Sequence, residues 1–563
     1  MAQRTPLSRE HFFYALILLL ALVLRFGSLG GAPLNEFEAT AALPASQLAS
    51  GAQPSPGEQP GYVLLTSLLF GLFGSGEFLA RFWPALFGLA LVALPYFWRD
   101  LLGKNVALLL AFILAIDPGL VAVSRLASGQ MLALCTALLA LTAWRHGRPV
   151  LAGLLAALAL LSSPLVYFGL GAALLVWATL RMPVHLDKIA LRSFTLAALA
   201  VLLLGGTLLF SVPGGLAGAG QVFYSFFTGF PSFAGLGLGA IFFVLLGYAL
   251  PALIFGGLGA WRGWRQGDPV GRALSLFAAY AFFLVLVNPS RQAADLLWIL
   301  LPLWALAAHE LSRYLHAPED EPVATIGETG LMLLLAAFLV PTLARLADSG
   351  FFLAPGPDNA FPAISSHGTI ALFVLGIAGL ATALIALGWA RRAAAQGLVW
   401  ALAIVFALFL LSASTRFSRL EATAANELWS PGTAAGQLGI LRASLADLSF
   451  WNQGQPAALP VEVRIESSSL RWALRDYAQV GSDSRLPALA ITSGEGETPA
   501  EFAAYRGQSF ALSVQRGWES WPPNFFAWLL FRQAPTQSQQ VILWANPDLF
   551  ADTASVDPES DTP

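Results

Sequence analysis

Residues 11–28 read HFFYALILLLALVLRFGS, an apolar run in which Arg25 is the only side chain with a permanent charge. An α-helix needs about 20 apolar residues to cross the hydrocarbon layer of a bilayer. A cleaved signal peptide would end at a site of small residues, whereas this run has Arg25 near its end and a glycine-rich stretch after it. We therefore interpret the run as a retained signal anchor, and we expect an α-helical membrane fold.

Runs of the same kind recur along the whole chain and predict about thirteen membrane spans. They lie near residues 11–28, 80–98, 105–123, 128–144, 149–162, 164–180, 190–211, 236–260, 271–287, 294–314, 327–346, 368–390 and 395–413. Residues 61–74 are apolar but short, and we expect a helix at the interface or against the bundle. Hydrophobic residues make up 57% of the chain and charged residues 11%, against about 25% charged residues in soluble domains. That composition excludes a secreted, fibrous or disordered chain.

The charges in the loops between the runs predict an orientation in the membrane. Cytoplasmic loops of membrane proteins are rich in Lys and Arg. If the N-terminus is cytoplasmic, the inside loops carry Arg99, Lys104, Arg145, Arg148, Arg181, Lys188, Arg192, Arg262, Arg265, Arg272, Arg313, Arg391 and Arg392. An odd number of spans then places residues 414–563, with 10 basic and 16 acidic residues, outside the cytoplasm. No basic surface is available to neutralise phosphates of a nucleic acid, so we exclude nucleic-acid binding.

Composition divides the chain into three parts. Residues 1–413 form the membrane domain, with a long first outer loop at 29–79, and residues 548–563 form an acidic tail that we expect to be disordered. Between them, residues 414–547 mix alternating and helical patterns, which predicts a small extracytoplasmic α/β domain. Its expected strands lie near 459–465, 486–492, 508–515 and 540–544, and its expected helices near 468–479 and 524–532. Cys135 is the single cysteine, so a disulfide framework is excluded.

The informative residues of such an apolar chain are ionisable groups at the outer membrane face, because they are costly unless paired or hydrated. Glu36 and Glu38 follow the first span, and two carboxylates at this spacing can serve as a base and as a metal or hydrogen-bond partner. The alternative is a pair of solvated loop acids. Asp117 precedes Pro118 near the outer end of a span, where a structural cap is the preferred interpretation.

Three arginines are predicted at the same face: Arg81, Arg125 and Arg291. A guanidinium group matches the geometry of a phosphate and can hold the head group of a lipid phosphate. The alternative for each is ordinary contact of a long side chain with membrane head groups.

A series of motifs follows the first span in a fixed order. They are Leu34-Asn35-Glu36, Gln59-Pro60-Gly61-Tyr62, the run LLFGLFG at 68–74, Arg81-Phe82-Trp83-Pro84-Ala85-Leu86, and Asp117-Pro118 with Ser124-Arg125. Their order and spacing across residues 15–145 resemble the GT-C glycosyltransferases, and within them the protein O-mannosyltransferase-like and aminoarabinose-transferase-like proteins. The resemblance implies a GT-C-like transmembrane domain in residues 1–413.

The resemblance also implies a function at the outer face of a prokaryotic plasma membrane. Such proteins move a sugar from a polyprenyl-phosphate donor to an acceptor glycan, lipid or protein. Carried over by position, Glu36 is the acid that activates the acceptor or supports a divalent metal ion, with Glu38 beside it. Arg81, Arg125 and Arg291 become candidates for the donor phosphate. The sugar, the acceptor and the metal stay open.

Three positions that are charged in the family are uncharged here, namely Asn35, Gln59 and Gln130. An amide cannot accept a proton at neutral pH, so the role of base passes to Glu36 or is lost. Two hypotheses follow: a working glycosyltransferase, or a non-catalytic GT-C-fold subunit that binds polyprenyl-linked glycans. A transporter is the third, but the sequence shows no internal repeat and no paired Gly/Pro-broken spans in matching halves. We therefore add Asp117 and these three amide residues as candidates for lining a cavity at the outer membrane face.

The predicted orientation can be tested with single cysteines in a chain whose Cys135 has been replaced. We expect cysteines at Ser468 and Ser493 to react with a membrane-impermeant thiol reagent in intact cells. A cysteine at Arg391 should react only after lysis, because positive loops stay inside. Labelling at 468 and 493 only after lysis would contradict the whole orientation.

Overall fold

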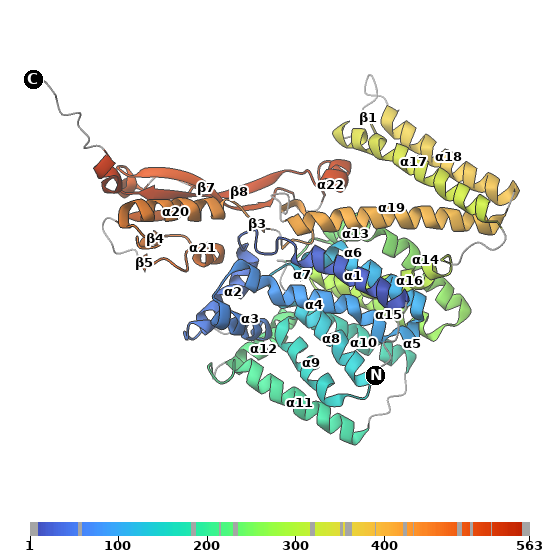
Figure 1. The fold of residues 1–563 in the computed structure, drawn as a ribbon, viewed down its shortest axis with the longest axis horizontal. Helices are drawn as coiled ribbons and strands as arrows, with labels where there is room; N and C mark the ends of the chain where they lie inside the picture. The colour runs from blue at the N-terminus through green and yellow to red at the C-terminus, as the bar shows by residue number, and fades with distance from the viewer. Residues whose placement is uncertain are drawn as a thin grey trace, which may run out of the picture.

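The computed structural model describes residues 9–54, 59–181, 187–212, 215–228, 235–315, 321–349, 353–354, 363–388, 390–419, 425–431, 433–480, 487–495, 499–518 and 521–553. A bundle of helices occupies the first three quarters of the chain, and a sheet with three helices follows (Figure 1). The strands of this sheet and the predicted spans lie in two separate regions of the chain.

Every predicted span coincides with a helix or a pair of helices. They are α1 (Arg9–Phe26), α4 (Glu77–Phe97), α6 (Lys104–Ile116), α7 (Pro118–Ser124), α8 (Gln130–Arg145), α9 (Pro149–Ser162), α10 (Leu165–Leu180), α11 (Lys188–Gly206), α13 (Leu238–Tyr248), α14 (Leu250–Gln266), α15 (Pro269–Val287), η1 (Ala293–Leu296), α16 (Leu297–Ser312), α17 (Pro322–Ser349), α18 (Ser366–Gly388) and α19 (Arg391–Arg419). The short α5 (Arg99–Leu102) and α12 (Gly215–Thr228) connect them.

Fewer helices are long and apolar enough to span a membrane than the sequence predicted. In the described residues, seven helices are long and apolar enough to cross a membrane, or up to nine if two bent pairs are counted as spans. Helices α8, α9 and α10 are apolar but have only 14 to 16 residues. The helical membrane fold is confirmed, and the count of thirteen is not.

Two of the predicted spans are bent. Helices α6 and α7 meet at an angle of 59°, and α13 and α14 at 86°. Asp117 lies at the first break with an extended backbone, because the residue before a proline is forced out of the helical region. At the second break Pro251 has no N–H to continue the helical ladder. The expected single spans at 105–123 and 236–260 are therefore each two helices.

The long first loop contains two helices, α2 (Glu36–Ala49) and α3 (Pro60–Phe73). A capping box starts α2: the Asn35 side chain accepts from the Glu38 N–H, and the Glu38 carboxylate accepts from the Asn35 N–H. Helix α3 covers the apolar segment that the sequence marked as too short to cross, and its 14 residues agree with that interpretation.

The C-terminal region is a six-stranded sheet in the order β3-β7-β8-β6-β4-β5. Its strands are β3 (Thr433–Ala435), β4 (Val461–Val463), β5 (Gln479–Val480), β6 (Leu489–Ser493), β7 (Arg506–Arg516) and β8 (Thr536–Ala545). Its α-helices are α20 (Leu438–Gln453), α21 (Ser468–Ala473) and α22 (Phe525–Phe531), with 3-10 turns η4 (Ala500–Phe502) and η5 (Pro547–Thr553). Strands β4, β5 and β6 run parallel, and the remaining pairs are antiparallel.

The predicted α/β layer is present, but β3, α20 and β5 were not foreseen. Leucines of α20 pack with strand residues of the sheet in one buried cluster that includes Leu441, Leu445 and Ile491. The segment η5 lies at the start of the tail that was expected to be disordered, and residues 554–563 lie outside the described ones. A two-stranded pairing of β1 (Leu353–Ala354) with β2 (Ala363–Ile364) joins α17 and α18.

The C-terminal domain lies against one end of the bundle. Helix α21 packs on α2 of the first loop, and α22 packs on α17 (Figure 1). A buried ion pair between Arg532 and Glu427, with the Tyr248 hydroxyl donating to the same carboxylate, fastens α22 to the break between α13 and α14. The loops of the bundle and the sheet domain therefore share one enclosed region.

Candidate functional site

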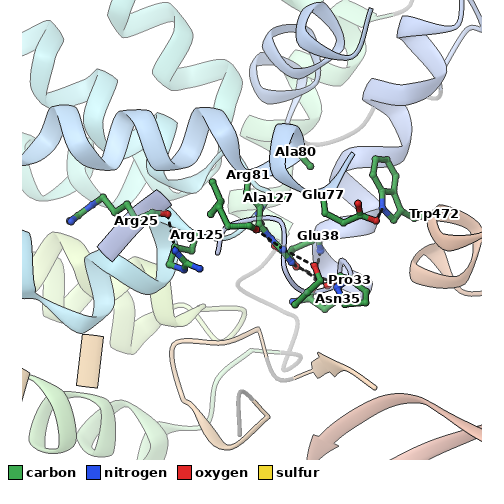
Figure 2. Close-up of polar contacts among 12 residues, drawn as sticks. Arg25, Pro33, Asn35, Glu38, Glu77, Ala80, Arg81, Arg125, Ala127 and Trp472 are labelled. Carbon is green, nitrogen blue, oxygen red and sulfur yellow. Dashed lines mark hydrogen bonds and ion pairs between the residues drawn. The ribbon is translucent and has the colours of Figure 1, made fainter. Parts of the chain in front are cut away.

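The carboxylate of Glu38 forms a buried ion pair with Arg81 on α4. Its Oε1 accepts from Nε of Arg81 at 2.7 Å, and its Oε2 accepts from Nη2 at 2.7 Å. Oε1 also accepts from the N–H of Ala127 at 3.0 Å. Glu38 and Arg81 are 1% and 2% exposed. The pair thus connects α2, α4 and the turn before α8 (Figure 2).

Arg81 has no N–H left for a ligand. Beyond the two bonds to Glu38, Nη1 donates to the carbonyls of Leu29 and Ala32, and Nη2 donates to that of Pro33. All five N–H groups of the guanidinium are therefore used inside the protein. The geometry favours a structural role over the predicted contact with a donor phosphate.

Arg125 is also directed at the backbone. Its Nη1 donates to the carbonyls of Leu24 and Arg25 at the end of α1, and its Nη2 donates to that of Ser418 at the end of α19. Figure 2 shows Arg125 beside Arg25. Its Nε is buried without a partner among the described residues. Arg125 therefore holds the ends of two distant helices together.

Glu36 lies at the junction of the two domains. Its carboxylate accepts from the N–H groups of Ser468 and Ser469 at 2.6 and 3.1 Å, and from the hydroxyls of Ser467 and Ser469 at 2.7 and 2.9 Å. Burial on its own would raise the pKa of the Glu36 carboxyl, but these four hydrogen bonds hold that pKa below its usual value. Glu36 thus binds the first turn of α21.

Asp117 takes the structural role that the sequence favoured. Its Oδ1 accepts from the N–H of Leu120 at the start of α7, and its Oδ2 accepts from the indole of Trp304. The residue is 1% exposed and lies inside the bundle. Asp117 is therefore a helix cap and is not among the residues that line the cavities described next.

A cavity of about 760 Å³ lies between the bundle and the C-terminal domain. Arg291 and Gln130 line it from the membrane domain, and Arg516 at the end of β7 lines it from the sheet. Trp429 and Trp518 add aromatic walls. The arrangement is a positively charged hollow shared by two domains.

Both arginines of this cavity keep donors available. Arg291 donates from Nε to Leu236 and from Nη1 to Leu286 and Asn288, and its Nη2 has no acceptor in the described part of the chain. Arg516 has no side-chain hydrogen bond to any described residue, and its guanidinium lies 5.2 Å from the ring of Trp518. Burial lowers the pKa of both groups from the usual arginine value. An anion entering the cavity would compensate for that burial.

Two smaller cavities adjoin the large one. A cavity of about 320 Å³ is lined by Asn35, Glu38, Arg81 and Arg125, and it shares Leu126, Trp429 and Ser430 with the large cavity. A cavity of about 310 Å³ is lined by Gln59, Gln130, Gln292 and Asp295, and it shares Phe37, Gln130, Ser290 and Gln292 with the large cavity. Apart from Glu36 and Asp117, all predicted site residues therefore line one continuous system.

Sequence reasoning missed Arg516 and Gln292 as parts of this system. Arg516 ends an alternating strand more than 200 positions after Arg291, and only the docking of the sheet brings the two together. Gln292 follows Arg291 directly, so its place beside a predicted arginine was the available signal. Within the described ranges, no group of three His, Cys, Asp or Glu residues could hold a metal ion.

The ion pair between Glu38 and Arg81 should dominate the stability of the first loop. Removing one partner of a buried pair costs about 3–5 kcal/mol, because the other charge stays buried and uncompensated. We expect Arg81→Leu to lower the midpoint of thermal unfolding in detergent markedly. The double change Glu38→Leu with Arg81→Leu should cost less than the sum of the single changes. Exposed Arg391→Leu is the control, and equal unfolding of Arg81→Leu and wild type would contradict the assignment.

The Glu36 contact should respond to pH in a defined direction. Because the folded pKa is lowered, its stabilising contribution is present above the unfolded value of about 4.3 and is lost as pH falls through the folded pKa. We expect Glu36→Gln to speed amide hydrogen exchange at Ser468 and Ser469 about tenfold at neutral pH, because charge-assisted hydrogen bonds are lost. Glu466→Gln, an exposed neighbour, should leave that exchange unchanged. Unaltered exchange in Glu36→Gln would exclude the docking role.

Comparisons with known proteins agree with this architecture. Residues 54–209 match the model of the dolichyl-phosphate-mannose-protein mannosyltransferase family. The structure of ArnT from Cupriavidus metallidurans in the apo state covers 96% of this chain and 98% of its own, with 14% identity and a TM-score of 0.55. ArnT from the same organism bound to undecaprenyl phosphate covers 87% of this chain and 94% of its own, with 17% identity and a TM-score of 0.51.

No curated protein matched the chain in sequence. The resemblance that the motifs indicated is nevertheless confirmed by the family match within residues 54–209 and by the shared fold. The chain therefore has the GT-C glycosyltransferase fold, and its residues 54–209 carry the sequence pattern of the dolichyl-phosphate-mannose-protein mannosyltransferases.

Proposed function

We propose that this chain is a membrane glycosyltransferase that takes its sugar from a polyprenyl-phosphate donor. The observation that carries the proposal is the cavity of about 760 Å³ that Arg291 lines from the bundle and Arg516 lines from the sheet. A hollow with two arginines is suited to an anion, and a phosphate matches the planar fork of a guanidinium. The ArnT structure of the same fold was solved with undecaprenyl phosphate, which supports the same class of ligand here.

Unpaired donors at the cavity give the phosphate its partners. Nη2 of Arg291 and the guanidinium of Arg516 have no acceptors in the described part of the chain. The indole N–H of Trp429, which lines the same cavity, is buried and also without an acceptor there. An unsatisfied buried donor costs about 1–3 kcal/mol, so a ligand that supplies acceptors gains that energy.

The proposed reaction joins the acceptor to the anomeric carbon of the donor. The acceptor hydroxyl oxygen forms the new bond, the bond between the anomeric carbon and the phosphate oxygen breaks, and its electron pair leaves with the polyprenyl phosphate. The hydroxyl proton passes to a carboxylate. Arginines beside the phosphate would stabilise the negative charge that grows on the leaving group, which is the largest single contribution in many enzymes.

The proposed reaction needs a carboxylate that accepts the proton of the hydroxyl. Glu36 and Glu38 were predicted for it, but hydrogen bonds to the serines of α21 and to Arg81 already occupy their oxygens. We assign positioning roles to both. Asp295 lines the adjoining cavity, and only its Oδ2 is used, by the N–H of Gln292. Asp295 is therefore our proposed base.

A second function is favoured by a specific observation. The acid at the family's motif position is Glu36, and it serves as a clamp between domains, while Asn35, Gln59 and Gln130 are uncharged. A chain that kept the cavity and lost the base would bind polyprenyl-linked glycans without transferring the sugar. The two functions share the phosphate site and differ in turnover.

The phosphate site can be tested by binding of undecaprenyl phosphate to the purified full-length protein. Arg291→Ala and Arg516→Ala should each weaken binding roughly 10- to 150-fold, because a charge-assisted hydrogen bond contributes about 1.5–3 kcal/mol. Arg506→Ala is the matched control, since Arg506 lies at the other end of β7 and is exposed. Unchanged affinity in the double variant Arg291→Ala with Arg516→Ala would exclude the cavity as the site.

Turnover of undecaprenyl-phosphate-linked sugars by the wild-type protein separates the two functions. Release of undecaprenyl phosphate together with a glycosylated acceptor supports the enzyme. Tight binding of the lipid with no release across neutral and amino sugars supports the non-catalytic subunit.

A further inference from the structure

The small cavity beside the arginines is built from amide side chains. Gln59 lies at the start of α3, Gln130 at the start of α8, and Gln292 at the start of η1. These three elements come from separate parts of the chain, and they bring three primary amides to one hollow of about 310 Å³. A fourth amide in its lining is Asn288, whose Oδ1 accepts from the N–H of Ser290. The described residues that line it include no lysine or arginine, and Asp295 is the one acid among them.

Each of the three glutamine side chains is held by a hydrogen bond to only one of its two polar atoms. Oε1 of Gln59 accepts from the N–H of Gly129 at 2.7 Å. Nε2 of Gln130 donates to Oε1 of Gln292. In the described part of the chain, Nε2 of Gln59, Oε1 of Gln130 and Nε2 of Gln292 have no partner. Two donors and one acceptor are thus fixed in orientation and remain available.

A sugar site also needs an apolar surface against which the ring can pack, and the walls of this cavity provide one. Phe37, Pro164 and Phe168 line it with apolar faces, against which the C–H groups of a pyranose ring can pack. Rigid amides next to an apolar face can bond the hydroxyls of a sugar without a charge. An anionic uronic acid would find no lysine or arginine among the described lining residues and would face the carboxylate of Asp295.

We propose that Gln59, Gln130 and Gln292 form the subsite for the sugar of the donor and select a neutral hexose over an anionic uronic acid. The inference rests on the proposed function, because the subsite is useful only if the phosphate binds in the cavity that Arg291 and Arg516 line. The two cavities share Gln130, Gln292, Ser290 and Phe37, so a sugar attached to that phosphate lies next to the amides.

The experiment compares three lipids with the purified full-length protein: bare undecaprenyl phosphate, the same lipid carrying a neutral hexose, and the same lipid carrying a uronic acid. We expect the neutral hexose to raise affinity about tenfold over the bare lipid, as a few new hydrogen bonds would. The uronic acid should give no gain, because its carboxylate faces that of Asp295. Equal affinity for the two glycosylated lipids would overturn the selection of an uncharged sugar.

Substitution tests which residues carry the preference. Gln59→Leu changes the one amide of the three that does not line the phosphate cavity, so it should abolish the gain from the neutral hexose and leave the affinity for bare undecaprenyl phosphate unchanged. Gln130→Lys should turn the preference toward the uronic acid, because the new ammonium group pairs with its carboxylate. Gln47→Leu, an exposed position on α2 outside the cavities, is the control and should keep the wild-type order.

Failure of the subsite and failure of the phosphate site give different results. If wild type binds bare undecaprenyl phosphate and Gln59→Leu weakens all three lipids equally, the amides do not bind the sugar and this inference is overturned. If wild type does not bind bare undecaprenyl phosphate at all, the proposed function fails, and the subsite fails with it.

Discussion

The buried pair of Glu38 and Arg81 is the interaction on which the rest of the site depends. It joins the first loop, α4 and the turn before α8 at one point, and Arg81 also binds three carbonyls of the chain leading into α2. A charged pair removed from water is stable only when its remaining donors and acceptors are satisfied. Here they are, so the start of α2 has one position relative to the bundle. That position decides where Glu36 and Phe37 lie.

From this fixed start, α2 organises the contact between the two domains. Glu36 lies two residues before Glu38, and its carboxylate accepts a hydrogen bond from the first turn of α21. Phe37 lines the two cavities that contain the amides and the arginines. Arg125 adds a second tie between the ends of α1 and α19, where the chain leaves the bundle for the sheet domain. The functional hollow therefore has walls that are positioned by ion pairs and helix caps next to it.

Much of this architecture could be predicted from the sequence, because apolar length alone decides which segments become membrane helices. The breaks at Asp117 and Ala249 were harder, since a proline within an apolar run is compatible with a straight, kinked or broken helix. For the site, several of the lining residues could be predicted, but their roles could not. Arg81 and Arg291 look alike as isolated arginines near the membrane face. Only the three-dimensional contacts show that Arg81 is fully paired and that Arg291 keeps a free N–H. Nothing in the sequence around Arg516 indicated that it lines the cavity, because its position there depends on how a distant sheet docks.

The place of Arg516 on the sheet has a consequence for the biosynthesis of the chain. Membrane helices insert in the order in which they leave the ribosome, so Arg291 reaches its loop well before β7 exists. At about 5–20 residues per second, Arg516 follows roughly 10–45 seconds later. During that interval the bundle holds only the membrane half of the cationic hollow. A nascent chain is thus without its second arginine until the sheet has folded and docked, and the timing of translation keeps the lipid phosphate site incomplete while the helices are still assembling.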